Sequence, residues 1–169
     1  MGKRNEVEQL VSSERRGMLQ YASYRLGSRD DAEDAVQDVF LHLQQRLADG
    51  MEIKNLRAYL YRSLLNLCTS RERQENTLVM FPPECLPDSA ETATGALERE
   101  DFEYEFRRVR LLLASIPDEQ AEVIRLRFYG DRSFQEIADI LGVPLTTAKS
   151  RFIYGLEKIR RGMHVTSHV

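Results

Sequence analysis

The sequence contains no tryptophan, only two cysteines and three histidines among its 169 residues, and no long apolar run. Cys68 and Cys85 form no CxxC pair and the histidines are scattered, so we expect neither a disulfide framework nor a metal site. No stretch approaches the roughly eighteen apolar residues of a membrane span, and the first residues lack the apolar segment of a secretory signal. We therefore expect a cytoplasmic protein without membrane insertion or cofactors.

The net charge is small, −3, but the charged residues, 30% of the chain, are strongly segregated along it. Segments 54–73 and 145–162 each carry five basic residues and one glutamate, a net of +4 (5 − 1). Segment 28–40 carries five carboxylates and one arginine, and segment 75–97 carries four carboxylates and no base. Two basic patches separated by acidic stretches are typical of a protein that contacts DNA twice and another partner elsewhere.

Apolar residues recur at helical spacing almost throughout, and strand-like alternation is absent, which predicts an all-α protein. We predict a first small helical domain over residues 1–74. Its second helix should turn an apolar stripe inward, formed by Ala32, Val36, Val39, Phe40, Leu43 and Leu47. Its third helix should bury Leu64 and also Cys68, as a small hydrophobe.

Residues 75–97 break the helical periodicity with three prolines followed by Ser, Thr and Gly, and predict an acidic, Pro-containing linker. A second small helical domain follows over residues 98–169. Its first helix is expected to bury five apolar residues, Phe102, Phe106, Val109, Leu113 and Ile116.

The segment "SFQEIADILGVPLTTAKSRFIYGLEKIRR" predicts a helix-turn-helix in this second domain. Ser133 and Glu136 have the spacing of a capping box, and Gly142 permits the tight turn. The first helix of the pair should bury Ile137, Ala138 and Leu141, and the second Ala148, Phe152, Leu156 and Ile159.

The second of these helices begins with polar residues that face outward in this pattern: Thr146, Thr147, Lys149, Ser150, Arg151 and Tyr154. In a helix-turn-helix, the start of the second helix enters the major groove, where hydroxyls and long cations reach phosphates and base edges. A basic amphipathic helix can also be a solvated face without a ligand, and the spacing alone leaves both interpretations open.

Three segments in this order resemble bacterial RNA polymerase sigma factors of the extracytoplasmic-function (ECF) class. "IPDEQAEVIRLRFYGDRSFQEIADILGVPLTTAKSRFIYGLEKIR" is similar to their C-terminal domain, which reads the minus-35 promoter element. "DDAEDAVQDVFLHLQQ" is similar to the helix that docks on the polymerase clamp, and "LRAYLYRSLLNL" to the helix that meets the minus-10 element. The resemblance covers about residues 5 to 162.

The resemblance implies that the first domain holds an opened DNA strand at the minus-10 element. The residues assigned to this role are Arg57, Tyr59, Arg62 and Asn66, with the loop Asp49–Asn55 as the wall of a pocket for a flipped base. Stacking and phosphate contacts would offset the cost of unstacking bases. The family often has a tryptophan about where Tyr59 stands, and this chain has none, so we expect the aromatic wedge between bases to be weaker or differently placed here. Tyr61 could serve the strand or the protein core.

The resemblance also assigns an acidic helical face to docking on polymerase, formed by Asp31, Glu33, Asp34, Gln37 and Asp38. From the residues alone, this face could equally be a solvated helix N-terminus satisfied by its own dipole. The acidic linker would occupy the RNA exit path, or it could be an inert spacer.

The implied function is a sigma factor that directs core RNA polymerase to specific promoter DNA and is sequestered reversibly by an anti-sigma factor. No nucleophile–base pair, phosphate loop or metal cluster can be assembled, so we expect no enzyme activity. Two other classes stay open: a stand-alone helix-turn-helix repressor or activator, and a helical adaptor whose basic helices bind protein. A requirement for core polymerase in promoter binding discriminates between them.

Overall fold

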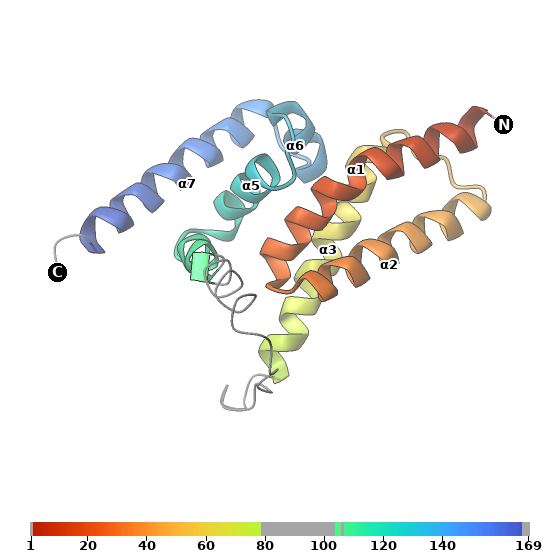
Figure 1. Cartoon of the computed structure of the whole chain (residues 1–169). Helices are drawn as coiled ribbons and strands as arrows, with labels where there is room; N and C mark the ends of the chain where they lie inside the picture. The colour runs from red at the N-terminus through yellow and green to blue at the C-terminus, as the bar shows by residue number, and fades with distance from the viewer. Residues whose placement is uncertain (1, 79–103, 106, 167–169) are drawn as a thin grey trace.

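The computed structural model describes residues 2–78, 104–105 and 107–166, and every regular element within these ranges is a helix. The N-terminal unit consists of α1 (Gly2–Leu26), α2 (Arg29–Ala48) and α3 (Leu56–Leu78). The C-terminal unit consists of a helical segment at 107–114, α5 (Asp118–Phe128), α6 (Phe134–Leu141) and α7 (Leu145–Thr166). Figure 1 shows the two groups of helices side by side, with α1 and α3 next to α5 and α6. The predicted all-α fold is confirmed.

Short polar side chains define where the N-terminal helices begin. The Ser28 hydroxyl caps α2 by accepting a hydrogen bond from the Asp31 N–H at 3.3 Å, and Asp30 and Asp31 lie in the positive first turn. Asn55 caps α3 in the same way, because its Oδ1 accepts from the Ala58 N–H at 3.1 Å. Gly27, with a φ of 73°, makes the sharp turn that separates α1 from α2.

The core of the N-terminal unit lies where the three helices meet. Met18 is buried there, and Val36, Leu64 and Cys68 are buried as predicted. Leu47 was predicted to point inward, but it is 37% exposed because it lies in the last turn of α2, beyond the core that ends at Leu43. The sequence left open whether Tyr61 contacts the DNA strand or packs in the core. Its side chain is fully buried, so it belongs to the core.

The helix-turn-helix is present in the C-terminal unit. Both hydrogen bonds of the capping box between Ser133 and Glu136 are formed. Gly142 ends α6 with a φ of 67°, and the Val143 N–H then donates to the Ala138 carbonyl, which closes the turn into α7. On α6 the buried set includes Ile140, whereas Leu141, predicted to be buried, is only half-buried.

The predicted burial of Leu156 on α7 is wrong, since this side chain is 36% exposed. Its neighbour Gly155 faces α5 instead. A Cβ on Gly155 would lie 2.8 Å from Ile124 Cδ1 and 3.2 Å from Gln120 Cβ, so only glycine permits α7 to approach α5 this closely. Val109, Leu113 and Ile116 pack inward as predicted, while Phe102 and Phe106 lie outside the described residues.

The two units share one core. Val123, Leu126, Ile137 and Ile140 of the C-terminal unit belong to the same buried cluster as Met18 and the other residues of α1, α2 and α3. The predicted boundaries of the first domain, linker and second domain stay a prediction. The described part of the chain shows only that α3 runs through Leu78, beyond residue 74, while 79–97 lie outside it.

The burial of Cys68 predicts a thiol that reagents attack very slowly in the folded chain. Burial raises the pKa of Cys68 to about 12, so little thiolate exists near pH 8. In a Cys85→Ser background, which leaves Cys68 as the single thiol, we expect alkylation by iodoacetamide to be at least about a hundredfold slower than in the unfolded chain. Similar rates with and without guanidinium chloride would contradict this burial.

Candidate nucleic-acid interface

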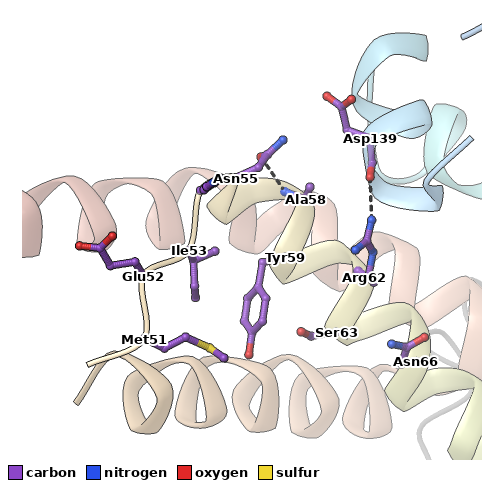
Figure 2. Close-up of a pocket in the computed structure, with 11 residues that line it drawn as sticks. Met51, Glu52, Ile53, Asn55, Ala58, Tyr59, Arg62, Ser63, Asn66 and Asp139 are labelled. Atoms are coloured by element: carbon purple, nitrogen blue, oxygen red, sulfur yellow. Dashed lines mark hydrogen bonds between the residues drawn. The ribbon is translucent and has the colours of Figure 1, made fainter. Parts of the chain in front are cut away.

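A hollow of about 640 Å³ lies between α3 and the loop that precedes it. Tyr59, Arg62 and Asn66, three of the four residues predicted for the minus-10 element, line it. So do residues 51–55 of the loop predicted to wall it (Figure 2). Arg57, the fourth predicted residue, does not. The hollow is open, and its lining combines cations, amides and an aromatic ring with two carboxylates, those of Glu52 and Asp139, and a few apolar side chains.

The residues that line the hollow differ in how much they offer to a ligand. Asn66 is exposed, and its amide can both donate and accept. Tyr59 is half-buried and packs against the core, so only part of its ring faces the hollow. Lys54, which lies in the predicted loop, also lines the hollow, and so does Ser63, which we did not predict. Lys54 belongs to the basic segment 54–73 of the sequence, but its position beside the hollow depends on the fold of the loop that precedes α3.

Arg62 already has partners from the C-terminal unit. Its Nε donates to the Ile140 carbonyl at 3.0 Å, and one terminal nitrogen donates to the Asp139 carbonyl at 2.9 Å. These two carbonyls lie at the C-terminal end of α6, where a helix lacks internal donors and carries partial negative charge. Arg62 therefore caps α6 across the contact between the units.

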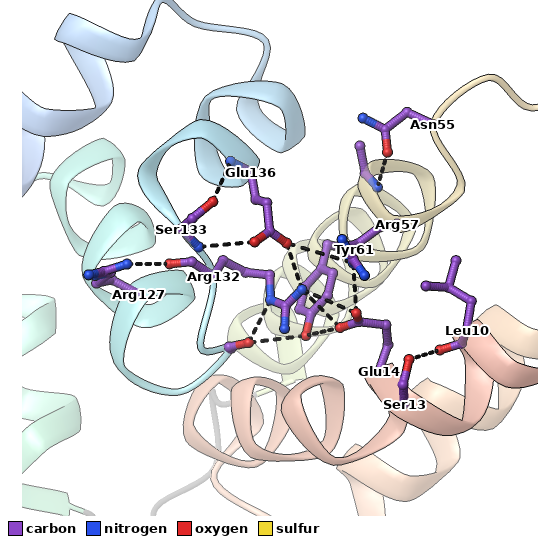
Figure 3. Close-up of polar contacts among 12 residues, drawn as sticks. Leu10, Ser13, Glu14, Asn55, Arg57, Tyr61, Arg127, Arg132, Ser133 and Glu136 are labelled. Carbon is purple, nitrogen blue, oxygen red and sulfur yellow. Dashed lines mark hydrogen bonds and ion pairs between the residues drawn. The ribbon is translucent and has the colours of Figure 1, made fainter.

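Arg57 belongs to a second contact between the units, a cluster of two arginines and two glutamates (Figure 3). Arg57 Nε lies 2.7 Å from Glu14 Oε1 and 3.7 Å from Glu136 Oε2. Arg132 Nη1 lies 3.0 Å from Glu14 Oε2 and 2.7 Å from Glu136 Oε2. The Tyr61 hydroxyl donates to the Gly130 carbonyl at 3.2 Å beside this cluster.

The chemistry of this charge cluster favours its ionised form. Burial disfavours the charge on Glu136, but Arg132 and the hydrogen bonds from Ser133 outweigh it and lower the pKa of the Glu136 carboxyl. Burial raises the pKa of Tyr61, which keeps its hydroxyl protonated as a donor. Arg132 and Glu136 are only four positions apart, but sequence patterns gave no indication of the whole cluster, because Glu14 and Arg57 lie far from them along the chain.

A third contact lies at the other end of the seam between the two units, where α1 and α3 meet α5 and α6. The Arg25 guanidinium and the Tyr21 hydroxyl both donate to Glu122 of α5, and Arg25 Nε also donates to Glu72 at 2.9 Å. Burial and the neighbouring Glu122 raise the pKa of Tyr21 well above its usual value. The rings of Tyr24 and Tyr129 stack with centroids 3.6 Å apart.

The start of α7 presents the residues predicted to read DNA. Thr146, Lys149, Ser150 and Tyr154 are exposed, while Thr147 and Arg151 are half-buried. Arg151 lies 3.6 Å from Glu119 of α5, whose side chain is itself exposed. A weak ion pair of this kind can be exchanged for a phosphate without leaving a buried charge behind.

The five residues predicted to dock on polymerase, Asp31, Glu33, Asp34, Gln37 and Asp38, are all exposed on α2. The acids at 34 and 38 are partly neutralised by Arg71 of α3, which donates to Asp34 at 3.2 Å and to Asp38 at 2.7 Å. This face of α2 therefore carries a row of carboxylates, two of which bind the Arg71 guanidinium of α3.

Among the described residues, no group of histidine, cysteine, aspartate and glutamate side chains could hold a metal ion. None of the helices described is both long and apolar enough to cross a membrane.

Two family models match this chain, one on each unit. The model for Sigma-70 region 2 matches residues 10–77, and the model for Sigma-70, region 4 matches residues 112–161. The first match contains α2 and α3 with the hollow, and the second contains the helix-turn-helix.

Curated relatives and solved structures agree with these models. RNA polymerase sigma factor SigZ of Bacillus subtilis (strain 168) is 24% identical over 164 residues, which are 96% of this chain and 90% of the relative. ECF RNA polymerase sigma factor SigW of the same organism is 27% identical over 80% of this chain and 77% of its own length.

The fold is similar to that of CnrH in complex with the cytosolic domain of CnrY, with a TM-score of 0.67, 22% identity and coverage of 96% of this chain and 90% of CnrH. It is also similar to the sigma factor RpoE from Bartonella quintana in complex with the anti-sigma factor NepR, with a TM-score of 0.60, 21% identity and coverage of 97% and 98%. With both regions matched in order on helices that carry the corresponding surfaces, the chain belongs to the sigma-70 family, as a sigma factor of the ECF class.

Proposed function

We propose that this chain directs core RNA polymerase to specific promoters and helps to open them. The observation that carries this function is the presence of two basic helices, α3 and α7, in one chain with an exposed acidic face on α2. A stand-alone repressor would need only the helix-turn-helix. The polymerase supplies the chemistry, and this chain acts as its promoter-reading subunit, in the cytoplasm.

The C-terminal unit reads the minus-35 element as duplex DNA. Thr146, Lys149 and Ser150 lie on the exposed start of α7, the part of a helix-turn-helix that enters the major groove. Lys149 and Arg151 contact phosphates or guanine edges, and the hydroxyls fix the register of the helix on the backbone.

The N-terminal unit holds one strand of the opened minus-10 element in the hollow beside α3. Asn66 hydrogen-bonds a base edge, the exposed part of the Tyr59 ring stacks on a base, and Arg57 and Arg62 bind phosphates. Lys54 adds a further cation at the rim of the hollow. Each base that stacks contributes about 1–3 kcal/mol, which offsets the few kcal/mol lost on unstacking.

We further propose that α2 docks on the polymerase through Asp31, Glu33, Asp34, Gln37 and Asp38, and that an anti-sigma factor sequesters the chain. The similar RpoE structure, which holds the anti-sigma factor NepR, supports the second proposal. Domain boundaries at 1–74, 75–97 and 98–169 are part of the same proposal.

The double substitution Lys149→Ala and Arg151→Ala should abolish transcription from a cognate promoter, because it removes two cations from the groove-facing start of α7. Binding to core polymerase should be unchanged. Runoff transcription and co-purification with polymerase measure the two effects. Lys158→Ala with Arg160→Ala is the matched control, since it removes two exposed charges farther along the same helix. Equal loss of polymerase binding would contradict the assignment.

Charge reversal at Asp34 and Asp38 should weaken polymerase association at least about tenfold, because it replaces two of the four carboxylates of this face with cations and cancels its net negative charge. Arg71→Ala controls for the lost ion pairs, since it breaks the same two contacts and leaves both carboxylates in place. We expect Arg71→Ala to retain polymerase binding. Unchanged co-purification of the doubly reversed variant would remove α2 from the docking surface.

A further inference from the structure

We propose that Ile153 of α7 selects a thymine in the minus-35 element by packing against the C5-methyl group of that base. This inference rests on the proposed function, because that function places the start of α7 in the major groove. It adds an aliphatic side chain to a predicted set of residues that otherwise offers hydroxyl groups and cations.

Ile153 is a large apolar side chain that the fold leaves in solvent. It is 56% exposed, whereas Ala148 and Phe152 on the inward side of the same helix are buried and half-buried. Ile153 belongs to neither of the two apolar clusters found among the described residues. Packing within the C-terminal unit therefore does not account for an isoleucine at this position.

The position of Ile153 continues the row of side chains proposed to face DNA. Four exposed residues of α7 are spaced i, i+3, i+4 and i+7: Thr146, Lys149, Ser150 and Ile153. At about 100° per residue, this spacing puts them on one face of the helix. Homeodomain recognition helices read bases with four residues at the same spacing. The geometry therefore brings Ile153 against base edges when the first turns of α7 enter the groove.

The chemistry of the major groove determines which base an aliphatic side chain prefers. Thymine presents an apolar C5-methyl group there, whereas adenine, guanine and cytosine present hydrogen-bond donors and acceptors. An aliphatic side chain packed against those polar groups removes their water without replacing its hydrogen bonds, which costs free energy. Ile153 therefore favours thymine and disfavours the other three bases at the position that it contacts.

The β-branched shape of isoleucine suits such a contact. In a helix, isoleucine has one strongly preferred χ1 rotamer, so Ile153 loses little conformational entropy when it packs against a base. Lys149, one turn earlier on the same face, instead carries a long flexible cation that attracts phosphates of any sequence. Affinity and selectivity for the minus-35 element thus have separate sources on this face of α7.

Glu157 marks the end of the base-reading part of α7. It is exposed one turn beyond Ile153, at i+4 on the same side of the helix. The phosphates on both sides of the groove repel a carboxylate, so the part of α7 that reads bases ends at Ile153. Leu156, which is 36% exposed, lies beyond this limit and therefore serves as a control.

The experiment first identifies the thymine. Core polymerase with the full-length wild type is incubated with a promoter library whose upstream segment is randomised, and the DNA that polymerase retains is sequenced. We expect a minus-35 consensus with a thymine, on either strand, whose preference is lost when Ile153→Ala replaces wild type. Preferences at the other positions should remain, because the exposed Ile153 can be truncated without a change in the core.

Replacement of that thymine by deoxyuridine then removes the C5-methyl group and nothing else. We expect the wild-type complex to bind the deoxyuridine duplex about fourfold more weakly than the thymine duplex, the factor for burial of one methyl-sized group. The difference should vanish for Ile153→Ala. Ile153→Val keeps an apolar, β-branched side chain and should preserve most of the difference, while Leu156→Ala should leave it unchanged.

Three results would overturn the inference: a consensus in which no thymine depends on Ile153, equal binding of both duplexes by wild type, or an Ile153→Ala variant that still prefers thymine to deoxyuridine. Weaker association of Ile153→Ala with polymerase in the absence of DNA would also refute it, and would assign this face to a protein partner. In each case the proposed function stands if wild type still selects promoters. Wild type that selects no DNA with core polymerase refutes the proposed function, and the inference with it.

Discussion

The arrangement of the whole molecule depends on how one buried carboxylate, that of Glu14, is neutralised. It lies in the first helix, yet one of its two arginine partners, Arg132, belongs to the C-terminal unit. A buried charge that loses its partners costs several kcal/mol, so this pairing gives the contact between the units a specific geometry. The apolar core then continues across the seam, because Leu126 and Ile137 join the residues of α1 and α3.

The surfaces that face outward follow from the same geometry. With α1 and α3 turned toward α5 and α6, the acidic face of α2 and the polar start of α7 remain exposed. The hollow on α3 lies at the edge of the seam, which is why Asp139 can reach it. The surfaces proposed for polymerase docking and minus-35 recognition are thus exposed while Arg62 is hydrogen-bonded to the end of α6.

Local sequence signals predicted most of the fold. The capping box at Ser133, the left-handed Gly142 and the burial of Cys68 all depend on residues close in sequence or on one helical face. Leu156 was misassigned because helical periodicity cannot distinguish a glycine packed against a neighbour from one in solvent. The partners of Arg57 and Arg62 were also out of reach, since Glu14 lies 43 positions from Arg57, and the carbonyls that bind Arg62 are more than seventy positions from it.

The glycine at 155 has a mechanical consequence. Because Gly155 lets α7 pack directly on Ile124 and Gln120 of α5, no layer of larger side chains separates α7 from α5 at this point. The end of α7 that is proposed to enter the major groove is thereby packed on α5. If α7 reads the minus-35 element as proposed, adjustment to promoters with different distances between their two elements comes from rotation of α5 and α7 together, and not from bending of α7 away from α5.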